Sequence, residues 1–501
     1  MIFPKLMHLK GWGLRTMTSL QSSSLTGIVQ HGELSSLGDE ALVRLLHQEF
    51  APEVERLKRV PRRQGEGEDG TVPAGTIMVK KGRDLALLTP SRLLFGEDFC
   101  EINRTITNIL SVKWLMADQY DVFTAHQSPA VRLSVGTFRR FRFRADPILT
   151  DAEQLMALIV ALLVGDIGKD PQLAGDIAAR RASMPSSSPS PLPKATRDTN
   201  TNTGNHDELL ADAVGLGLLD GPLQLLSPAR REDVILGIHV GATLNIPQLM
   251  QGENVPGSLQ RILRFQGHPS AFLLKYMEIM FDVAGAAAHL DAGGATSMTE
   301  PVCQSFLQAF PILERVIAGR TSLRDAYDEV LHNRGRILAD QGFRDLSVET
   351  SPSDRALLRL FAMGRVADRR TAERFQQAFH GLSHATRDAL VRGLNVDGCD
   401  DDADNGRPAV VLYYMPSVFA EGLRALHDAP EEDQVAGLQS LMGFMARNFE
   451  ASSEDADRGG SSIRERDVSP VKEIVSSPQF RANPHILDSY ALPASESCGS
   501  G

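Results

Sequence analysis

The chain contains little cysteine. Its 501 residues include Cys100, Cys303, Cys399 and Cys498, and no two of them form a CxxC pair. Such wide spacing argues against a disulfide framework and against a zinc site built from thiolates. A reducing compartment fits this pattern best, and we expect a cytoplasmic protein.

Long apolar runs are also missing. The longest, Leu155 to Val164, has about half the length that crosses a bilayer, and it predicts a buried helix instead. Aromatic residues make up only 6% of the chain, so the core must consist mainly of Leu, Ala, Val and Ile. We therefore expect a soluble protein without a membrane partner.

Positive charge is in the minority, with 52 Lys and Arg against 63 Asp and Glu and a net charge of −11. This balance argues against general affinity for DNA or for anionic membranes. Residues 137–144, TFRRFRFR, are a local exception, because aromatic rings and arginines together can stack on bases and contact phosphates. The alternation favours an edge strand with Phe inward and Arg outward, and tRNA stays an open but disfavoured partner.

Acidic residues are absent from the first 32 positions, which contain Lys5, Lys10, Arg15 and several Ser. This composition is typical of a transit peptide, so a mitochondrial location is the alternative to the cytoplasm. A flexible leader explains the same composition.

Apolar residues at helical spacing dominate from residue 150 onward. We predict a mainly α protein, with a multi-helix core and a smaller mixed α/β N-terminal portion. The expected parts are a leader (1–38), a mixed α/β portion (39–149), a helical core (150–300) with a disordered insertion (180–205), a helical extension (301–450) and a largely disordered tail (451–501).

Four stretches within residues 165–291 combine histidines and acids: GDIGKD, NHDELL, GIHVGATLNIPQL and EIMFDVAGAAAHLDA. Imidazole nitrogen together with carboxylate oxygen suits iron, manganese or magnesium better than structural zinc. The candidate metal ligands are Asp166, His206, His239, Asp282 and His289.

The last of these stretches places Glu278, Asp282, Gly285 and His289 along one face of a helix. Alanines and glycine crowd the same segment, which permits close approach of another helix or leaves room for a ligand. Asp282 lies among Met, Phe and Val, so its carboxylate needs a partner.

GDIGKD resembles the HDIGK motif of the HD superfamily, which comprises helical metal-dependent phosphohydrolases and a branch of di-iron oxygenases. The resemblance covers roughly residues 126–291. Asp166 matches the Asp of the His-Asp pair, and Lys169 matches the Lys that follows it. His206 and His239 match the two spaced His, and Asp282 matches the late Asp. The chain departs from the pattern because Gly165 replaces the His of the pair and only His126 is available as the first His.

The resemblance implies a divalent metal that acidifies a bound water or binds O₂. Lys169 would then neutralise a phosphate or another anionic substrate, and Asp207 would act as base. We therefore expect a metal-dependent enzyme that acts on a small molecule by phosphoester hydrolysis or oxidation.

A second acidic run offers an alternative magnesium site. Asp400, Asp401 and Asp404 form a DDxxD pattern, which resembles the motif that holds magnesium and a diphosphate in class I terpene synthases. It is also partly similar to the DDxxE-type motif of cyclodipeptide synthases, which use aminoacyl-tRNA in natural-product biosynthesis. The neighbouring Gly and Asn residues favour a solvated acidic loop as the explanation of the run. A non-catalytic helical adaptor with a decayed pocket is the third alternative for the function.

Overall fold

The computed structural model describes residues 24–61, 89–184, 206–399, 408–454 and 463–490. The protein is mainly α-helical, as the sequence predicts. Most of its buried apolar side chains form one connected core that extends from Leu25 to Leu487, and Val255, Ala409 and Val411 form a small separate cluster. Both halves of the chain therefore contribute to the same core.

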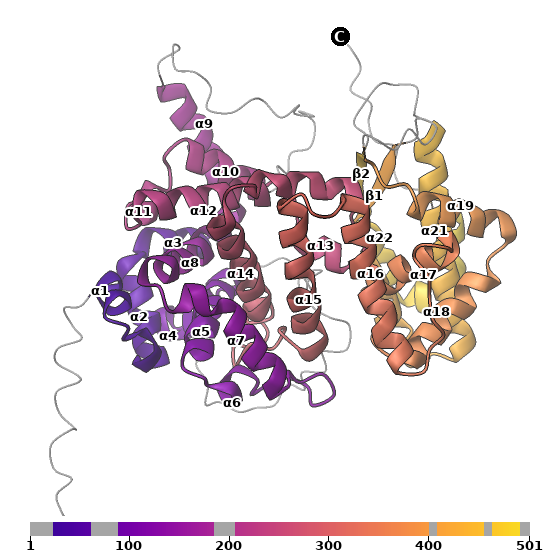
Figure 1. Cartoon of the computed structure of the whole chain (residues 1–501), viewed down its shortest axis with the longest axis horizontal. Coiled ribbons are helices and arrows are strands. Elements are labelled where there is room, and N and C mark those ends of the chain that lie inside the picture. The colour runs from indigo at the N-terminus through magenta and orange to yellow at the C-terminus, as the bar shows by residue number, and fades with distance from the viewer. Residues whose placement is uncertain (1–23, 62–88, 185–205, 400–407, 455–462, 491–501) are drawn as a thin grey trace, which may run out of the picture.

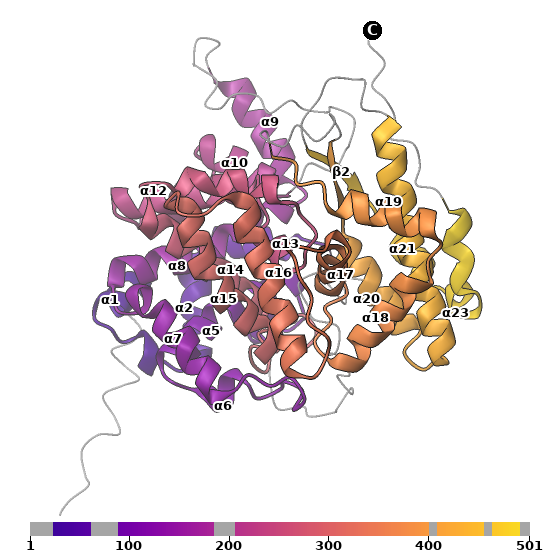
Figure 2. The same cartoon turned by 45° about the vertical axis from the view of Figure 1, so that its right-hand side comes forward.

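Three helices form the centre of the N-terminal half: α5 (Cys100–Met116), α8 (Ala152–Gly165) and α14 (Pro269–Gly285). Figures 1 and 2 show the other helices of this half around them. These are α1 (Leu25–Gln30), η2 (Leu34–Ser36), α2 (Asp39–Glu49), α3 (Ala51–Lys58), α4 (Pro90–Phe95), α6 (Tyr120–Phe123), α7 (Val135–Leu149), η3 (Ile167–Lys169), α9 (Leu173–Ser183), α10 (His206–Gly215), α11 (Asp220–Leu223), α12 (Pro228–Gly241), α13 (Ile246–Met250) and η4 (Pro256–Phe265).

Local sequence explains why α8 begins and where it lies. The side chain of Asp151 caps the helix by accepting hydrogen bonds from the backbone N–H groups of Glu153 and Gln154. Every residue from Leu155 to Val164 is buried, so the helix is enclosed on all sides. It ends at Gly165, and Asp166 follows as its C-cap residue.

The C-terminal half is built around the long helix α21 (Glu431–Glu454), which packs against α18, α19 and η6. In Figure 1, α15 and α16 lie between the two halves. The elements of this half are α15 (Glu300–Ile317), α16 (Leu323–Asp340), α17 (Pro352–Met363), α18 (Arg369–Gly381), α19 (His384–Leu394), β1 (Ala409–Tyr413), α20 (Met415–Ala425), β2 (Ile463–Asp467), α22 (Val471–Val475), α23 (Pro478–Ala482) and η6 (Pro484–Ser489).

Two predictions about secondary structure were wrong. The described residues of the 39–149 portion form only helices, and the strand-like TFRRFRFR stretch lies within α7. The expected disordered tail contains β2 and three short helices between residues 463 and 490. The strands among the described residues are β1 and β2, which pair in parallel with Ala409 opposite Ile463. Residues 185–205, most of the predicted insertion, lie outside the described residues.

No single described helix is both long enough and apolar enough to cross a membrane. Helix α7 and the α8–η3 segment reach the required length and apolarity only together, and the chain bends by 107° between them.

Candidate functional site

The residues of the GDIGKD stretch join a buried charged cluster rather than an open site. Lys169 Nζ lies 2.8 Å from Asp166 Oδ1 and 3.0 Å from Glu101 Oε2 of α5. Arg104, one turn further along α5, approaches the other oxygen of Glu101 at 3.3 Å. We call these four residues the η3 cluster. It joins the end of α8 to α5.

Proton binding differs between the two carboxyls of the η3 cluster. Burial and the neighbouring charge of Asp166 raise the pKa of Glu101 to about 7, although Lys169 and Arg104 oppose the rise. Burial would also raise the pKa of Asp166, but Lys169 and Arg104 outweigh it and hold that pKa below its ordinary value. Glu101 therefore changes its protonation near neutral pH, while Asp166 stays ionised.

A second charged cluster lies on α14. Lys275 Nζ contacts Glu278 Oε1 at 2.8 Å, and Asn108 of α5 donates a hydrogen bond to Asp282 Oδ1 at 3.0 Å. Burial would lower the pKa of Lys275, but Glu278, and after it Asp207 and Asp282, raise it above its ordinary value. Asp207 and Asp282, both predicted site residues, therefore act on the same ammonium group.

The three predicted histidines have separate environments. The His206 side chain is about half exposed, and its Nε2 lies 3.5 Å from Asp207 Oδ1. His239 lies on α12, where burial and the charge of Arg264 lower its pKa. His289 follows α14, and its Nδ1 lies 3.1 Å from the carbonyl oxygen of Ala286.

These positions do not fit the predicted metal site. In the described part of the chain, no three His, Cys, Asp or Glu side chains lie close enough together to hold a metal ion. Lysine ammonium groups accompany the acids in both clusters, and they supply positive charge where a metal would supply it. The alternative ligands Asp400, Asp401 and Asp404 lie outside the described residues. The HD resemblance and the roles expected for Lys169 and Asp207 stay predictions.

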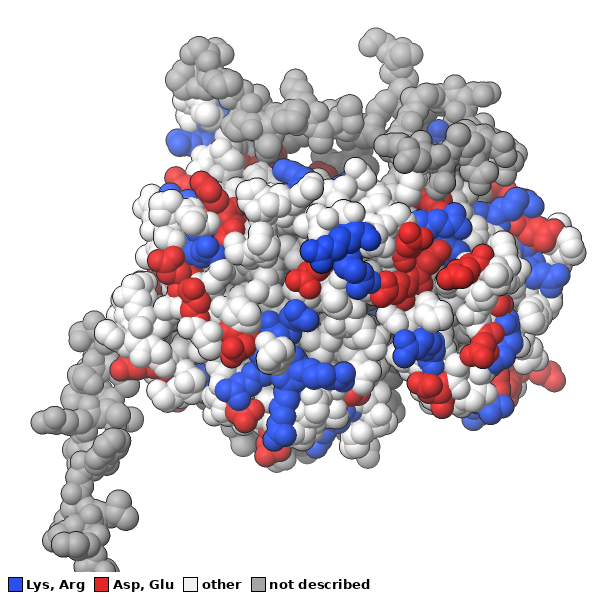
Figure 3. Space-filling model, viewed as in Figure 1, with Lys and Arg blue, Asp and Glu red and all other residues white. Residues whose placement is uncertain are grey.

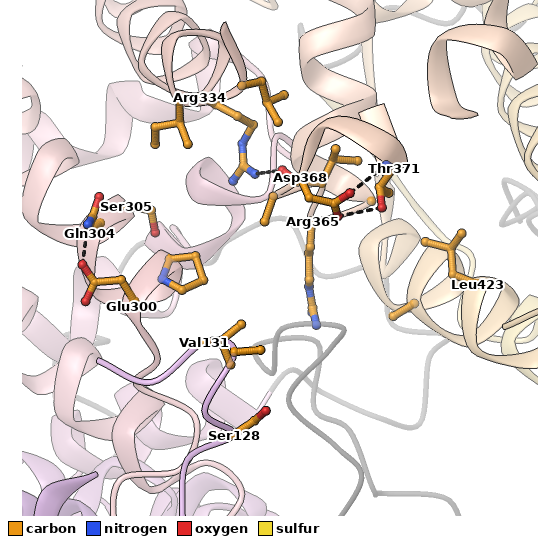
Figure 4. A pocket seen from close by; sticks show the side chains of 18 of the residues that line it. Ser128, Val131, Glu300, Gln304, Ser305, Arg334, Arg365, Asp368, Thr371 and Leu423 are labelled. Carbon is orange, nitrogen blue, oxygen red and sulfur yellow. Dashed lines mark hydrogen bonds between the residues drawn. The ribbon is translucent and has the colours of Figure 1, made fainter. Parts of the chain in front are cut away.

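A large cavity lies elsewhere, between the two halves of the protein. Its volume is about 1730 Å³, and loop 125–131, α15, α16, the start of α18 and the α20–α21 connection line it. Figure 4 shows Glu300, Gln304 and Ser305 on one side, and Thr371 and Leu423 on the other. Neutral polar side chains are frequent in the lining, namely Gln127, Ser128, Gln304, Ser305, Gln308, Asn333, Gln341, Thr371 and Gln434.

Arg334 of α16 reaches into this cavity (Figure 4). Its guanidinium donates hydrogen bonds to the carbonyl oxygens of Val366, at 3.2 Å, and Met250, at 3.1 Å. Burial lowers the pKa of Arg334 to about 10, and no carboxylate lies within 4 Å of it among the described residues. A guanidinium has five N–H groups, so donors remain after these two bonds.

The other charges of the lining are mostly balanced within the cavity wall. Each acid of the lining has a polar or charged partner, the pairs being Asp291 with His126, Glu300 with Thr137, Asp368 with Thr371, Asp428 with His427 and Glu431 with Arg370. Arg374 of α18 is a second exception beside Arg334. It contacts Gln434, and its buried Nε has no hydrogen-bond partner among the described residues.

Sequence reasoning did not find these cavity residues. Arg334 and Arg374 lie in ordinary amphipathic helices, and no motif or spacing distinguishes them from the other arginines. Glu101 was missed for the same reason.

Comparison with known proteins gives a family without an assigned activity. Neither a curated protein nor a solved structure matches the chain. Residues 43–487, most of the chain, match the model of a family of unknown function, DUF6829. The chain therefore belongs to the DUF6829 family.

Proposed function

We propose that this protein is a helical binding protein that holds an anionic, polar ligand in the cavity between its two halves. The observation that carries the proposal is Arg334, a guanidinium inside a cavity of about 1730 Å³ with no carboxylate partner in the described structure. The proposal is closest to the non-catalytic alternative that the sequence left open.

Charge and hydrogen bonding support an anionic ligand. A buried guanidinium without a counter-ion gains most from a carboxylate or phosphate, which can accept two parallel hydrogen bonds. Arg374 of α18 also lines the cavity, and its buried Nε has no hydrogen-bond partner among the described residues. The neutral amides and hydroxyls between the two arginines can bond the uncharged parts of a ligand without competing for its charge.

Size supports a ligand larger than a simple ion. Pockets for small molecules commonly have volumes of about 300–1000 Å³, and this cavity exceeds that range. A nucleotide-sized molecule or a short peptide with acidic groups fits better than a free phosphate.

Thermal melting with ATP and with pyrophosphate as anionic probes, at constant ionic strength, tests the proposal. At ten times the dissociation constant a ligand stabilises the folded state by about 1.4 kcal/mol. For a chain of this size we expect the melting temperature to rise by about 1–3 °C. Arg334→Gln and Arg374→Gln keep hydrogen-bond donors but remove the charge, and each should abolish most of this rise.

Arg336→Ala is the matched control, because Arg336 is exposed on the same helix and does not line the cavity. It should respond to the probes as the unmodified protein does. Equal responses in all variants would place the anions elsewhere and contradict the proposal, and so would the absence of a response to both probes.

The metal-dependent enzyme expected from the sequence is tested separately. Elemental analysis of the purified protein, repeated with Asp166→Asn and Asp282→Asn, shows whether iron, manganese or magnesium is bound through these acids. Stoichiometric metal that both substitutions remove would favour the enzyme over the binding protein.

A further inference from the structure

Helix α7 exposes an aromatic ring between arginines. Phe143 is 82% exposed, whereas the other exposed large hydrophobic side chains of the described structure are 36–43% exposed. Arg139 and Arg140 are also exposed, and they precede Phe143 by four and three residues. Residues at these spacings share one face of a helix, so the ring and both guanidinium groups form one surface, which we call the α7 surface.

Helical geometry, which replaced the predicted strand, creates this surface. A strand would have placed all three phenylalanines of TFRRFRFR on one face. In the helix, Phe138 and Phe141 are buried and pack against Phe123, while Phe143 points to the opposite side. The exposed ring therefore has no part in the core of the described structure.

Within the described structure, the two arginines of the α7 surface have no acidic partner. Arg142 pairs with Asp118 at 3.3 Å, and Arg144 lies over the ring of Phe310 at 4.4 Å. Arg140 donates only to the hydroxyl of Thr137, and neither it nor Arg139 lies within 4 Å of a described carboxylate. Figure 3 shows basic side chains gathered in the lower centre of the face, where Figure 1 draws α7.

We propose that the α7 surface binds single-stranded nucleic acid, with one base stacked on Phe143 and adjacent phosphates on Arg139 and Arg140. Every base has a flat π-face, so one exposed ring accepts it without sequence preference. Arginine adds bidentate contacts to phosphate. A lipid surface fits less well, because membrane-bound helices need a broad apolar face, and the large apolar side chains that α7 exposes are only Phe143 and the smaller Val135.

The proposed contact predicts weak, salt-dependent binding. Two phosphate contacts to a single strand give a slope of about −1.4 for log K against log[salt]. Removing one base stack should weaken binding about tenfold. The net charge of −11 opposes nucleic acid at long range, so binding is measured at low salt.

Fluorescence anisotropy with labelled rU₁₂ and dT₁₂ tests the proposal, with a 12-base-pair duplex as a competitor. Phe143→Leu keeps an apolar side chain but removes the ring, and it should weaken binding of the single strand about tenfold. Phe143→Tyr keeps the ring and should bind like the unmodified protein. Because Phe143 is almost fully exposed, both variants should fold normally, which their melting temperatures verify.

Arg139→Gln with Arg140→Gln should weaken binding further and flatten the salt dependence, whereas Arg336→Ala should change neither. The ratio of rU₁₂ to dT₁₂ affinity distinguishes RNA from DNA. Three results would overturn the proposal. The first is no binding of rU₁₂ or dT₁₂ at low salt. The others are a Phe143→Leu variant that binds the single strand as tightly as the unmodified protein, and a duplex that binds as tightly as the single strand. Sedimentation with phosphatidylserine vesicles that depends on Phe143, without binding of either strand, would assign the surface to membranes instead.

The proposal does not rest on the cavity. Arg334→Gln should leave binding of rU₁₂ unchanged, and Phe143→Leu should leave the response to ATP unchanged, so the two proposals fail independently.

Discussion

Lys169 Nζ lies between Asp166 and Glu101, at 2.8 Å from an oxygen of one and 3.0 Å from an oxygen of the other. A single ammonium group thus joins two carboxyls from α5 and the end of α8. This contact explains the charges of Asp166 and Lys169 after the apolar helix α8, because two buried acids beside each other need a cation. The GDIGKD stretch anchors the end of α8 to α5.

Stability should depend on pH through Glu101. Its pKa rises from an ordinary 4.5 to about 7 in the folded protein, so its stabilising contribution is complete below pH 4.5 and is lost as the pH rises through 7. This rise in the pKa corresponds to at most about 3–4 kcal/mol, at about 1.4 kcal/mol per pKa unit. Glu101→Gln cannot ionise and should remove this loss, which urea denaturation at pH 5, 7 and 8.5 measures.

Two comparisons make this pH test specific. Glu97→Gln changes an exposed acid of the neighbouring loop and should leave the pH profile unchanged. Burial also raises the pKa of Glu253 to about 8, so Glu253 changes stability with pH in the same direction as Glu101. Glu101→Gln should therefore flatten the pH profile only in part. An unchanged profile in Glu101→Gln would show that Glu101 is not the titrating group.

Removing only one member of the Lys275–Glu278 pair should lower the stability of the folded protein. Both side chains are nearly buried, and Lys275→Met leaves Glu278 without its nearest cation. We expect a loss of about 3–5 kcal/mol in the free energy of unfolding. Replacing both residues by Met should recover most of this loss, because the double variant no longer contains the Glu278 carboxylate that the single variant leaves without its nearest cation. Urea denaturation of the single and double variants distinguishes a buried pair from two independent surface charges.

Gly285 should tolerate no side chain. A Cβ atom there would lie 2.0 Å from Asn108 Oδ1 and 2.9 Å from the carbonyl oxygen of Arg104, both on α5. Gly285→Ala must therefore push α14 away from α5, and we expect a loss of about 1–3 kcal/mol or more. Gly175→Ala is the control, because nothing lies within 4 Å of its added Cβ. A melting temperature of Gly285→Ala equal to that of the control would contradict the close approach.

Much of the helical structure could be predicted from local sequence. Apolar residues at helical spacing predict helices from residue 150 onward, and α12 (Pro228–Gly241) and α15 (Glu300–Ile317) lie in this region. The side chain of Asp151 caps the start of α8. These features depend on apolar spacing and on capping residues within a few positions of each other, so the sequence contains the information they need.

Long-range packing overrode the local pattern in other places. The alternation of Phe and Arg predicted a strand, but Phe138 and Phe141 pack with neighbouring aromatic rings as parts of a helix. The strands β1 and β2 pair across some fifty residues of chain, and no local signal specifies such pairing. The cavity was missed because Arg334 becomes distinctive only through walls that α15, α16 and α18 supply together.

The sequence by itself determined that this protein is mainly helical and that an acid such as Asp282, placed among apolar residues, would need a partner. Only the tertiary structure decided which partners the acids have. Asp166 pairs with Lys169, and Asp282 accepts a hydrogen bond from Asn108 and acts on the charge of Lys275. The predicted histidines lie in other surroundings. The physical reason is that helix formation depends on neighbours in sequence, while the pairing of buried charges depends on which distant helices the shared apolar core brings together.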